Sequence, residues 1–227
     1  MYHKLFDQKK QDEMREFFLE LSKKGKLKKV NNSQMINLKS RNKFAIVVQG
    51  KLKQSLYSKN GAQKSLFILQ SGEIFGEMDY FSCGKNNIMT QAMEKSIIAV
   101  VTKTVLENEL KKDAKAYRYF LHSVTRKFRI VMLQMSGLVF NDSIGKLSEI
   151  LLRLSSQQGK KVDNGILIDF KLTHEEIASL IGCSRATVTK GLNKLKEENL
   201  ITIINKKVIV KDISGLEKYI DPVFCDN

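Results

Sequence analysis

The chain has 227 residues, of which 42% are hydrophobic and 28% charged, and its formal net charge is +15. This length allows one large or two modest domains with buried cores, while three dispersed cysteines exclude a disulfide framework and a paired-cysteine zinc site. No apolar run reaches the roughly 18 residues of a membrane-spanning helix, and the N-terminus lacks the apolar stretch of a signal peptide. We therefore expect a cytoplasmic protein without a membrane partner.

The basic surplus is distributed unevenly along the chain. Residues 1–140 carry 26 lysines and arginines against 12 acidic residues, and residues 141–227 carry 13 against 12. A basic surplus is typical of proteins that bind nucleic acid, so a non-specific, nucleoid-type nucleic-acid-binding protein is one hypothesis. An enzyme is not expected, because the three histidines are far apart and no nucleophile–base or metal-ligand spacing is present.

The first 105 residues have the pattern of a helix followed by short strands. Residues 1–29 are helical in composition, and residues 58–61 (Ser-Lys-Asn-Gly) are typical of a hairpin turn. Runs of β-branched and apolar residues predict strands at 44–48, 65–69 and 97–101. Short strands with evenly spaced turns indicate a β-sandwich or β-barrel, and we expect the N-terminal helix to pack beside it.

A long helix is predicted over residues 112–138. Its apolar side chains alternate steps of four and three, the spacing of about 3.5 residues that two helices need to pack knobs into holes. Basic side chains such as Arg126 and Lys127 lie off this seam. A core helix within one chain can show a similar stripe, but three unbroken heptads favour a symmetric dimer. The predicted dimer seam comprises Tyr117, Leu121, Val124, Phe128, Val131, Met135 and Leu138.

Residues 173–190 have the residue types and spacing of a helix-turn-helix. Thr173 can cap a first helix, and Glu176 can return the bond to complete a capping box. Gly182 can adopt the positive φ of the turn, and Ser184 can cap the second helix. The first helix has an apolar face formed by Ile177, Leu180 and Ile181, next to the small Ala178. An earlier helix precedes the motif, with an apolar face formed by Ile144, Leu147, Leu151 and Leu154.

The second helix of the motif has a buried and an outward face. Arg185 lies in its first turn, the end of a recognition helix that enters the major groove. Its buried side is formed by Val188, Leu192 and Leu195. Its outward side is formed by Ala186, Lys190 and Asn193. Residues 184–196 contain four basic residues and no acidic one. An ordinary helical hairpin with solvated polar residues is the alternative.

Two β-branched runs follow, residues 200–204 and 208–210, separated by a basic turn. This pattern predicts a strand–turn–strand hairpin directly after the recognition helix, which is the wing of a winged motif. Lys206 and Lys207 at its tip can meet DNA phosphates. Solubility of an exposed turn is the equally weighted alternative for these two lysines.

Taken in this order, the blocks resemble the Crp/Fnr family of bacterial transcription regulators. The resemblance is carried by residues 142–146 (Asp-Ser-Ile-Gly-Lys), by residues 181–188 (Ile-Gly-Cys-Ser-Arg-Ala-Thr-Val) and by the cassette at residues 71–77 (Ser-Gly-Glu-Ile-Phe-Gly-Glu). It implies an α+β fold with a cyclic-nucleotide-binding-like jelly-roll β-barrel, a dimerisation helix and a winged helix-turn-helix. The expected divisions are residues 1–110, 111–139 and 140–227. The implied partners are a pseudo-palindromic DNA duplex, a second copy of the chain and RNA polymerase.

The resemblance also implies roles for individual residues at the DNA. In this family, the residue at the position of Arg185 grips a guanine, and the residue at the position of Lys190 reaches bases or phosphate. The residues at the positions of Thr173 and Ser184 contact the DNA backbone. We expect the DNA-binding residues to be Thr173, Ser184, Arg185, Thr187, Thr189, Lys190, Lys206 and Lys207. Ala186 replaces the glutamate of the cyclic-AMP-binding members, which accepts a bond from cytosine, so a different operator sequence is expected. Gly191 stands where an apolar residue is usual, which predicts a looser second half of the helix.

The sensor positions depart further from the cyclic-AMP-binding members. The candidate effector pocket comprises Gly76, Glu77, Asn87, Ile88, Val131 and Met132. Asn87 and Ile88 stand at the phosphate-binding positions, so no cation meets a cyclic phosphate and cyclic AMP is not the expected effector. Gly76 and Glu77 are expected to preserve the turn of the barrel.

Two other cofactors of the family, an iron–sulfur cluster and haem, require particular ligand residues. An iron–sulfur cluster is not expected, because no cysteines gather near the N-terminus. Haem stays open without a supporting pattern, with His3, His122 and Cys83 as candidate ligands. A redox thiol at Cys83 and a regulator that needs no effector also stay open, while Cys183 fits a small buried residue of the turn. The effector is therefore not identified by the sequence.

Overall fold

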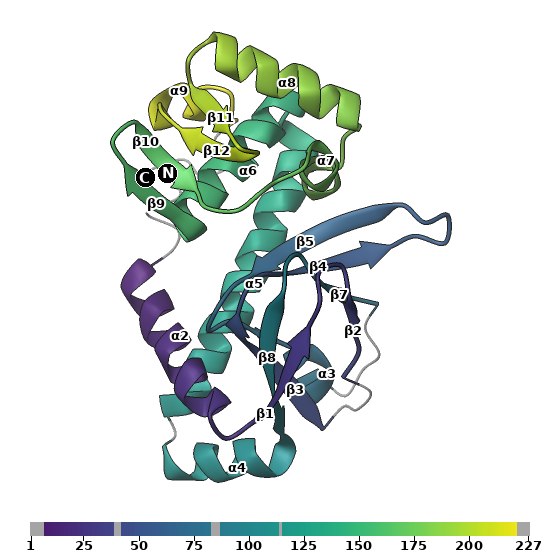
Figure 1. Cartoon of the computed structure of the whole chain (residues 1–227), viewed down its shortest axis with the longest axis vertical. Coiled ribbons are helices and arrows are strands. Elements are labelled where there is room, and N and C mark those ends of the chain that lie inside the picture. Colours follow the sequence, from purple (N-terminus) through teal and green to yellow (C-terminus); the bar gives the residue numbers. More distant parts are fainter. Residues whose placement is uncertain (1–6, 39–41, 83–86, 114, 222–227) are drawn as a thin grey trace. The chain divides into compact units, whose positions relative to one another are not determined.

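The computed structural model describes residues 7–38, 42–82, 87–113 and 115–221. The chain divides into two compact units (Figure 1). The N-terminal unit is Lys9–Ile130, and the C-terminal unit is Val131–Asn227 together with Met1–Gln8. Within the described ranges, no helix is both long enough and apolar enough to cross a membrane.

The N-terminal unit is a sandwich of two four-stranded antiparallel sheets. One sheet has the strand order β1-β8-β3-β6, and the other has the order β2-β7-β4-β5. The strands are β1 (Lys26–Val30), β2 (Met35–Ile36), β3 (Lys43–Gln49), β4 (Leu52–Tyr57), β5 (Gln63–Leu69), β6 (Ile74–Phe75), β7 (Met89–Ala92) and β8 (Ser96–Thr102). The two sheets do not close into one barrel, so the predicted jelly-roll fold takes the form of a sandwich.

The three strands predicted for this unit are confirmed as β3, β5 and β8. In β3, four consecutive apolar residues from Phe44 to Val47 are buried, and Ala45 lies opposite Val100 of β8. The predicted hairpin turn is also present between β4 and β5, where the N–H of Ser58 donates to the carbonyl of Ala62 (2.9 Å). Figure 1 shows this hairpin extending beyond the other strands of its sheet.

The helices of this unit are α2 (Gln8–Ser22), α3 (Glu77–Ser82), α4 (Lys103–Lys112) and the first part of α5 (Lys115–Phe140). Helix α2 packs Phe18 edge-to-face against Phe120 of α5, with ring centroids 4.9 Å apart. The prediction of helix through residue 29 is wrong, because the chain turns at residues 23–25 and Lys26–Val30 pairs with β8. Backbone pairing with a central strand outweighs the helical composition of this segment.

The predicted long helix is present but begins three residues later. The backbone of Asp113 is extended at the end of α4, and its carboxylate accepts the N–H of Lys115 (2.8 Å). Asp113 therefore ends one helix and satisfies an amide at the start of the next. Helix α5 then continues two residues beyond the predicted end, to Phe140.

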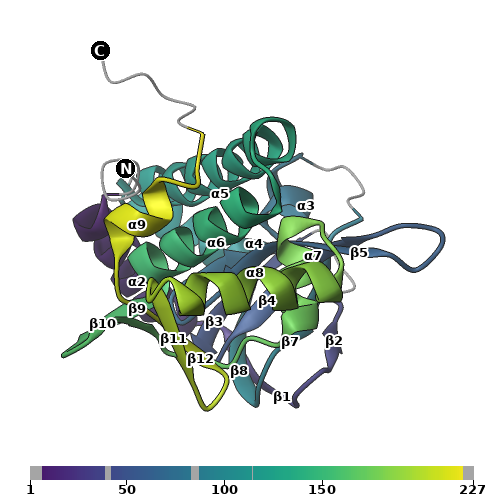
Figure 2. The ribbon, with the colours of Figure 1, turned by 90° about the horizontal axis from the view of Figure 1, so that it is seen from above.

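The C-terminal unit packs three helices against one another beside a small sheet. Figure 2 shows α6, α7 and α8 together, with β11 and β12 following the C-terminal end of α8. The helices are α6 (Ser143–Gln158), α7 (His174–Ile181), α8 (Arg185–Glu197) and α9 (Ile213–Glu217). The strands are β9 (Gly159–Val162), β10 (Gly165–Ile168), β11 (Ile201–Ile204) and β12 (Lys207–Val210). Three of the four predicted apolar residues of α6 (Leu147, Leu151 and Leu154) are buried, and Ile144 is half-buried.

The predicted wing of two strands is present as β11 and β12 but belongs to a larger sheet. The strand order is β11-β12-β10-β9, because Ile166 and Leu167 of β10 pair with Val210 and Ile209 of β12. Residues 159–168 form a hairpin that the sequence analysis missed. The turn of the wing contains two residues instead of three, since Lys207 already belongs to β12.

Candidate nucleic-acid interface

The first helix of the motif, α7, begins with both halves of the predicted capping box. The backbone N–H of Glu176 donates to Thr173 Oγ1 (3.1 Å), and the backbone N–H of Thr173 donates to Glu176 Oε2 (2.8 Å). These bonds satisfy amides that have no partner within the helix. Glu175 and Glu176 also place negative charge in the first turn, where the helix dipole favours it.

Replacing Thr173 by alanine is expected to lower the free energy of unfolding of the C-terminal unit by about 1 kcal/mol. The variant removes the acceptor for the N–H of Glu176 and the hydroxyl that donates to Glu176 Oε2, while the backbone N–H of residue 173 remains. Thermal unfolding followed by circular dichroism measures the change. Thr173→Ser retains the hydroxyl and is the matched control, so an equal loss in both variants would contradict the role of the cap.

The turn between the two helices has the conformation that the sequence predicts. Gly182 is left-handed (φ 71°, ψ 37°), and its N–H donates to the carbonyl of Ala178 (2.8 Å). The N–H of Cys183 meets the same carbonyl at 3.1 Å. Ser184 Oγ then accepts the N–H of Thr187 (3.1 Å) and caps α8. The turn therefore fixes where the second helix starts.

Helix α8 has the two faces that the sequence predicts. Its buried side consists of Val188, Leu192 and Leu195, none more than 1% exposed. Its exposed side includes Arg185, Ala186, Lys190 and Asn193. Arg185 occupies the first turn directly after the cap, so a rigid helix end presents its guanidinium to solvent.

Packing between α8 and α6 explains the glycine at position 191, and the sequence alone did not predict this contact. Gly191 lies on the buried side of α8, and a Cβ atom at this position would stand 2.8 Å from Leu147 Cδ2 of α6. Real Cβ atoms essentially never come this close to a neighbouring heavy atom. The helix continues to Glu197 beyond this glycine. The glycine lets α8 pack closely on α6.

Thr189 is joined to a residue that the sequence analysis missed. Thr189 Oγ1 donates to the carbonyl of Arg185 (3.0 Å) and lies 2.8 Å from His174 Nδ1. Because a hydroxyl has a single hydrogen, this arrangement makes His174 Nδ1–H the donor to Thr189. The contact ties the first residue of α7 to the half-buried side of α8. The position of His174 directly after the Thr173 cap was the feature of the sequence that could have identified it as an interface residue.

The two wing lysines have different surroundings. Asn205 and Lys206 have positive φ angles (52° and 64°) and form the tight turn, with Lys206 exposed. Lys207 Nζ instead donates to Asp169 Oδ1 at 2.7 Å, and Asp169 also pairs with Lys160. Lys207 therefore already has a carboxylate partner within the unit. Contact of either lysine with DNA phosphate stays a prediction, and Lys207 would have to leave Asp169 to make it.

Hydrogen bonds from Lys160 and Lys207 lower the pKa of Asp169 to about 2. A carboxylate with a lowered pKa stabilises the folded state above its ordinary pKa of 3.8, and this contribution is lost as pH falls through about 2. Asp169→Asn should therefore lower the unfolding midpoint at pH 7 by a few degrees, as expected for a partly exposed pair of about 1 kcal/mol or less.

The comparison of thermal unfolding at pH 7 and below pH 3 tests this linkage. The difference between Asp169→Asn and the unaltered protein should shrink at the lower pH. Asp163→Asn, in the neighbouring exposed turn, is the matched control. A difference between Asp169→Asn and the unaltered protein that is the same at both pH values would contradict the ion-pair explanation.

The side chains of the predicted dimer seam form an exposed side of α5. Six of its seven side chains are between 42% and 67% exposed, and Val131 is half-buried. On the opposite side of α5, Phe120, Ile130 and Leu133 are at most 5% exposed. A helix with apolar residues on both sides has more apolar surface than a single chain buries.

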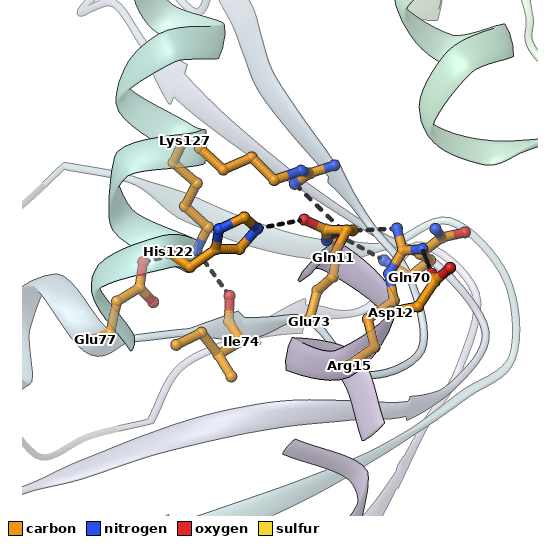
Figure 3. Close-up of polar contacts among 10 residues, drawn as sticks. Gln11, Asp12, Arg15, Gln70, Glu73, Ile74, Glu77, His122 and Lys127 are labelled. Atoms are coloured by element: carbon orange, nitrogen blue, oxygen red, sulfur yellow. Dashed lines mark hydrogen bonds and ion pairs between the residues drawn. The ribbon is translucent and has the colours of Figure 1, made fainter. Parts of the chain in front are cut away.

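The candidate effector residues differ in burial and belong to both units, so the pocket they would form stays a prediction. Glu77 is 3% exposed, whereas Asn87 is exposed and Ile88 half-buried. Val131 and Met132 belong to the C-terminal unit. Gly76 does preserve a turn, with φ 86°. Glu77 does more than preserve this turn, because Lys127 of α5 donates to its Oε1 at 2.6 Å (Figure 3).

A second buried carboxylate lies four residues earlier in the cassette. Glu73 Oε1 accepts hydrogen bonds from Gln11 Nε2 and Arg15 Nη2, both at 3.1 Å, and lies 3.3 Å from Arg126 Nη1. Burial alone would raise the pKa of Glu73, but the charges of Arg126 and Arg15 lower it overall. Glu73 therefore stays ionised among these cations. These contacts could not be predicted from the sequence, because the charged residues are far apart in the chain.

Of the candidate haem and redox residues, only His122 lies within the described ranges. His3 and Cys83 lie outside the described residues, and His122 Nε2 lies 3.3 Å from Gln11 Oε1 (Figure 3). Cys183 is a free, half-buried cysteine in the turn. Among the residues that the structure describes, no group of three or more histidine, cysteine, aspartate or glutamate side chains could hold a metal ion.

Comparisons with known proteins agree with both units. Residues 39–113 match the cyclic nucleotide-binding domain, and residues 145–219 match the Crp-like helix-turn-helix domain. The chain is 25% identical over 173 residues to a CRP-like cAMP-activated global transcriptional regulator of Mycobacterium tuberculosis, covering 76% of this chain and 77% of that protein. It is 26% identical over 166 residues to the global nitrogen regulator of a Nostoc species, covering 72% and 74%.

A solved structure shares the fold. A mutant of CooA from Carboxydothermus hydrogenoformans superposes with a TM-score of 0.74 at 22% identity, covering 88% of this chain and 89% of that one. Fold and interface together define a helix-turn-helix DNA-binding regulator with a cyclic-nucleotide-binding domain ahead of it. The chain belongs to the Crp/Fnr family of transcription regulators. The predictions of this family, of its fold class and of a regulator instead of an enzyme are confirmed.

Proposed function

We propose that the chain is a dimeric, sequence-specific regulator that reads DNA with α8. The observation that carries this proposal is the exposed first turn of α8. Arg185 follows the Ser184 cap directly, while the opposite side of the helix is fixed in the core. A guanidinium fork on a fixed helix end suits bidentate recognition of guanine O6 and N7 in the major groove.

The other residues of the interface take supporting roles in this proposal. Lys190 reaches bases or phosphate from the same exposed side, and Lys206 meets phosphate from the tip of the wing. Thr173, Ser184 and Thr187 lie at the two caps and contact the DNA backbone. The contacts of Thr189 and Lys207 within the chain give them a positioning role instead.

A symmetric dimer follows from the exposed seam of α5. Two copies of α5 would bury the exposed apolar residues against each other and hold two recognition helices for a pseudo-palindromic operator. The half-sites are then about 34–36 Å apart, one turn of the duplex. In this proposal residues 1–110 sense, residues 111–139 dimerise, residues 140–227 bind DNA, and the protein acts in the cytoplasm together with RNA polymerase.

The signal is proposed to differ from cyclic AMP, although the relative from Mycobacterium tuberculosis is named as cAMP-activated. Within the described residues, the cations near the cassette are the half-buried Arg15 and the buried Arg126 and Lys127, and each already pairs with a carboxylate of the chain. A cyclic phosphate would have to break one of these pairs, which is costly in a buried site. Native mass spectrometry of protein purified from its host would show a bound molecule directly.

Selection of duplexes from a random library tests the central proposal. Sequence-specific binding predicts enrichment of an inverted repeat, and the full chain should prefer this repeat strongly over a scrambled duplex at a fixed salt concentration. Equal affinity for both duplexes would instead support non-specific binding. Residues 1–140 contain 26 basic and 12 acidic residues, and this basic surplus is the observation that favours non-specific nucleic-acid binding as a second candidate function.

A further inference from the structure

Helix α5 carries two consecutive buried cations in the N-terminal unit. The side chains of Arg126 and Lys127 are only 8% and 9% exposed. Arg126 pairs with Glu73 at 3.3 Å, and Lys127 pairs with Glu77 at 2.6 Å. A charge that is buried without a partner is strongly destabilising, so each cation depends on its carboxylate. The two pairs join α5 to both ends of the short strand β6.

The surroundings of Lys127 are those of a receptor for a primary ammonium group. Lys127 Nζ donates to the carbonyl of Ile74 (2.8 Å) and to Glu77 Oε1 (Figure 3). It also lies 5.8 Å from the centre of the Phe67 ring. An ammonium group has three N–H donors and is attracted to aromatic faces. A carbonyl, a carboxylate and a ring therefore surround the single charge.

The two carboxylates differ in how much they depend on α5. Glu73 accepts hydrogen bonds from Gln11, Arg15 and the backbone N–H of Gln70 in addition to pairing with Arg126. Glu77 Oε1 is paired with Lys127, while its buried Oε2 has no hydrogen-bond partner in the described part of the chain. The buried charge of Glu77 therefore depends on the ammonium group of Lys127 in α5 for its neutralisation.

We propose that Ile74, Glu77 and Phe67 form an alkylammonium-binding site that the chain occupies with its own Lys127. The side chain acts as a tethered ligand, and it holds α5 against the cassette without a diffusible molecule at Glu77. A small molecule that uses Glu77 must first displace Lys127. This inference depends only on contacts within the N-terminal unit and is independent of the proposed DNA binding.

Chemical rescue of a Lys127→Ala variant of the full chain tests the site. The variant leaves Glu77 without its cation, and its unfolding midpoint should fall by roughly 6–20 °C. Propylammonium chloride should restore much of this loss in a saturable way, whereas sodium chloride at equal ionic strength and neutral 1-propanol should not. The unaltered protein and Lys115→Ala, which removes an exposed lysine of the same helix, should show no such response. The absence of rescue in a folded variant would overturn the proposal.

A measurement on the unaltered protein keeps the proposal testable if Lys127→Ala does not fold. Brief acetylation followed by peptide mass spectrometry compares the reactivity of lysines along α5. Lys127 should react at least about tenfold more slowly than the exposed Lys115, because its ammonium is buried and paired. Glu77→Gln should reduce this protection. Equal reactivity of Lys127 and Lys115 in the folded, unaltered chain would overturn the proposal.

Discussion

Arg185→Ala is expected to weaken operator binding and to relax the sequence preference at one base pair of each half-site, while leaving the fold intact. Arg185 is exposed in the first turn of α8, so its removal leaves the buried side of the helix unchanged. The loss of a bidentate base contact is worth about 1–3 kcal/mol, and it occurs twice in a dimer. Affinity for the selected operator should therefore fall by roughly 30-fold to 10⁴-fold, with relaxed preference at one base pair in each half-site.

Fluorescence anisotropy with the selected and a scrambled duplex measures both effects. Lys161→Ala is the matched control, because it also removes one exposed positive charge from the same unit but lies in β9, away from α8. The control should weaken binding to both duplexes slightly and equally. If Arg185→Ala also weakened both duplexes equally, Arg185 would contribute charge without reading a base.

Leu121→Asp is expected to convert the proposed dimer into a monomer. Leu121 is the most exposed residue of the seam, at 67%, and symmetric pairing would place a carboxylate from each chain in one apolar interface. Loss of the dimer removes the gain of linking two binding modules, which is roughly 10²–10⁴-fold in affinity. Sedimentation velocity measures the mass, and anisotropy on the operator measures the affinity.

The chain provides a closely matched control for this change. Leu27 is also a leucine of the N-terminal unit and is 61% exposed, but it lies on strand β1. Leu27→Asp should leave both the mass and the DNA affinity unchanged. A monomeric unaltered protein, or a dimer that persists in Leu121→Asp, would show that α5 does not form the interface.

The helix-turn-helix could be predicted in detail because its signals are local. The cap at Thr173, the left-handed Gly182 and the cap at Ser184 each depend on residues within four positions of one another. The apolar spacing of α8 follows from helix periodicity alone. These features are therefore recoverable from a single sequence without knowledge of the surrounding fold.

The charged groups of the N-terminal unit could not be predicted in the same way. Lys127 and Glu77 are 50 residues apart, and the ion pair exists because α5 passes the cassette in space. The hairpin of β9 and β10 was missed because its pairing with β12 provides the order that its short segments lack alone. Asp169 was missed as the partner of Lys207 for the same reason, since 38 residues separate them.

The glycine in the middle of α8 restricts how this protein can be re-engineered. Leu147 occupies the space that a side chain at position 191 would need. A bulky residue there in a transplanted recognition helix would either force the end of the Leu147 side chain to move or push the helix away from α6, and in the second case its base-reading end would shift as well. A graft that retains Gly191 or trims Leu147 avoids both outcomes.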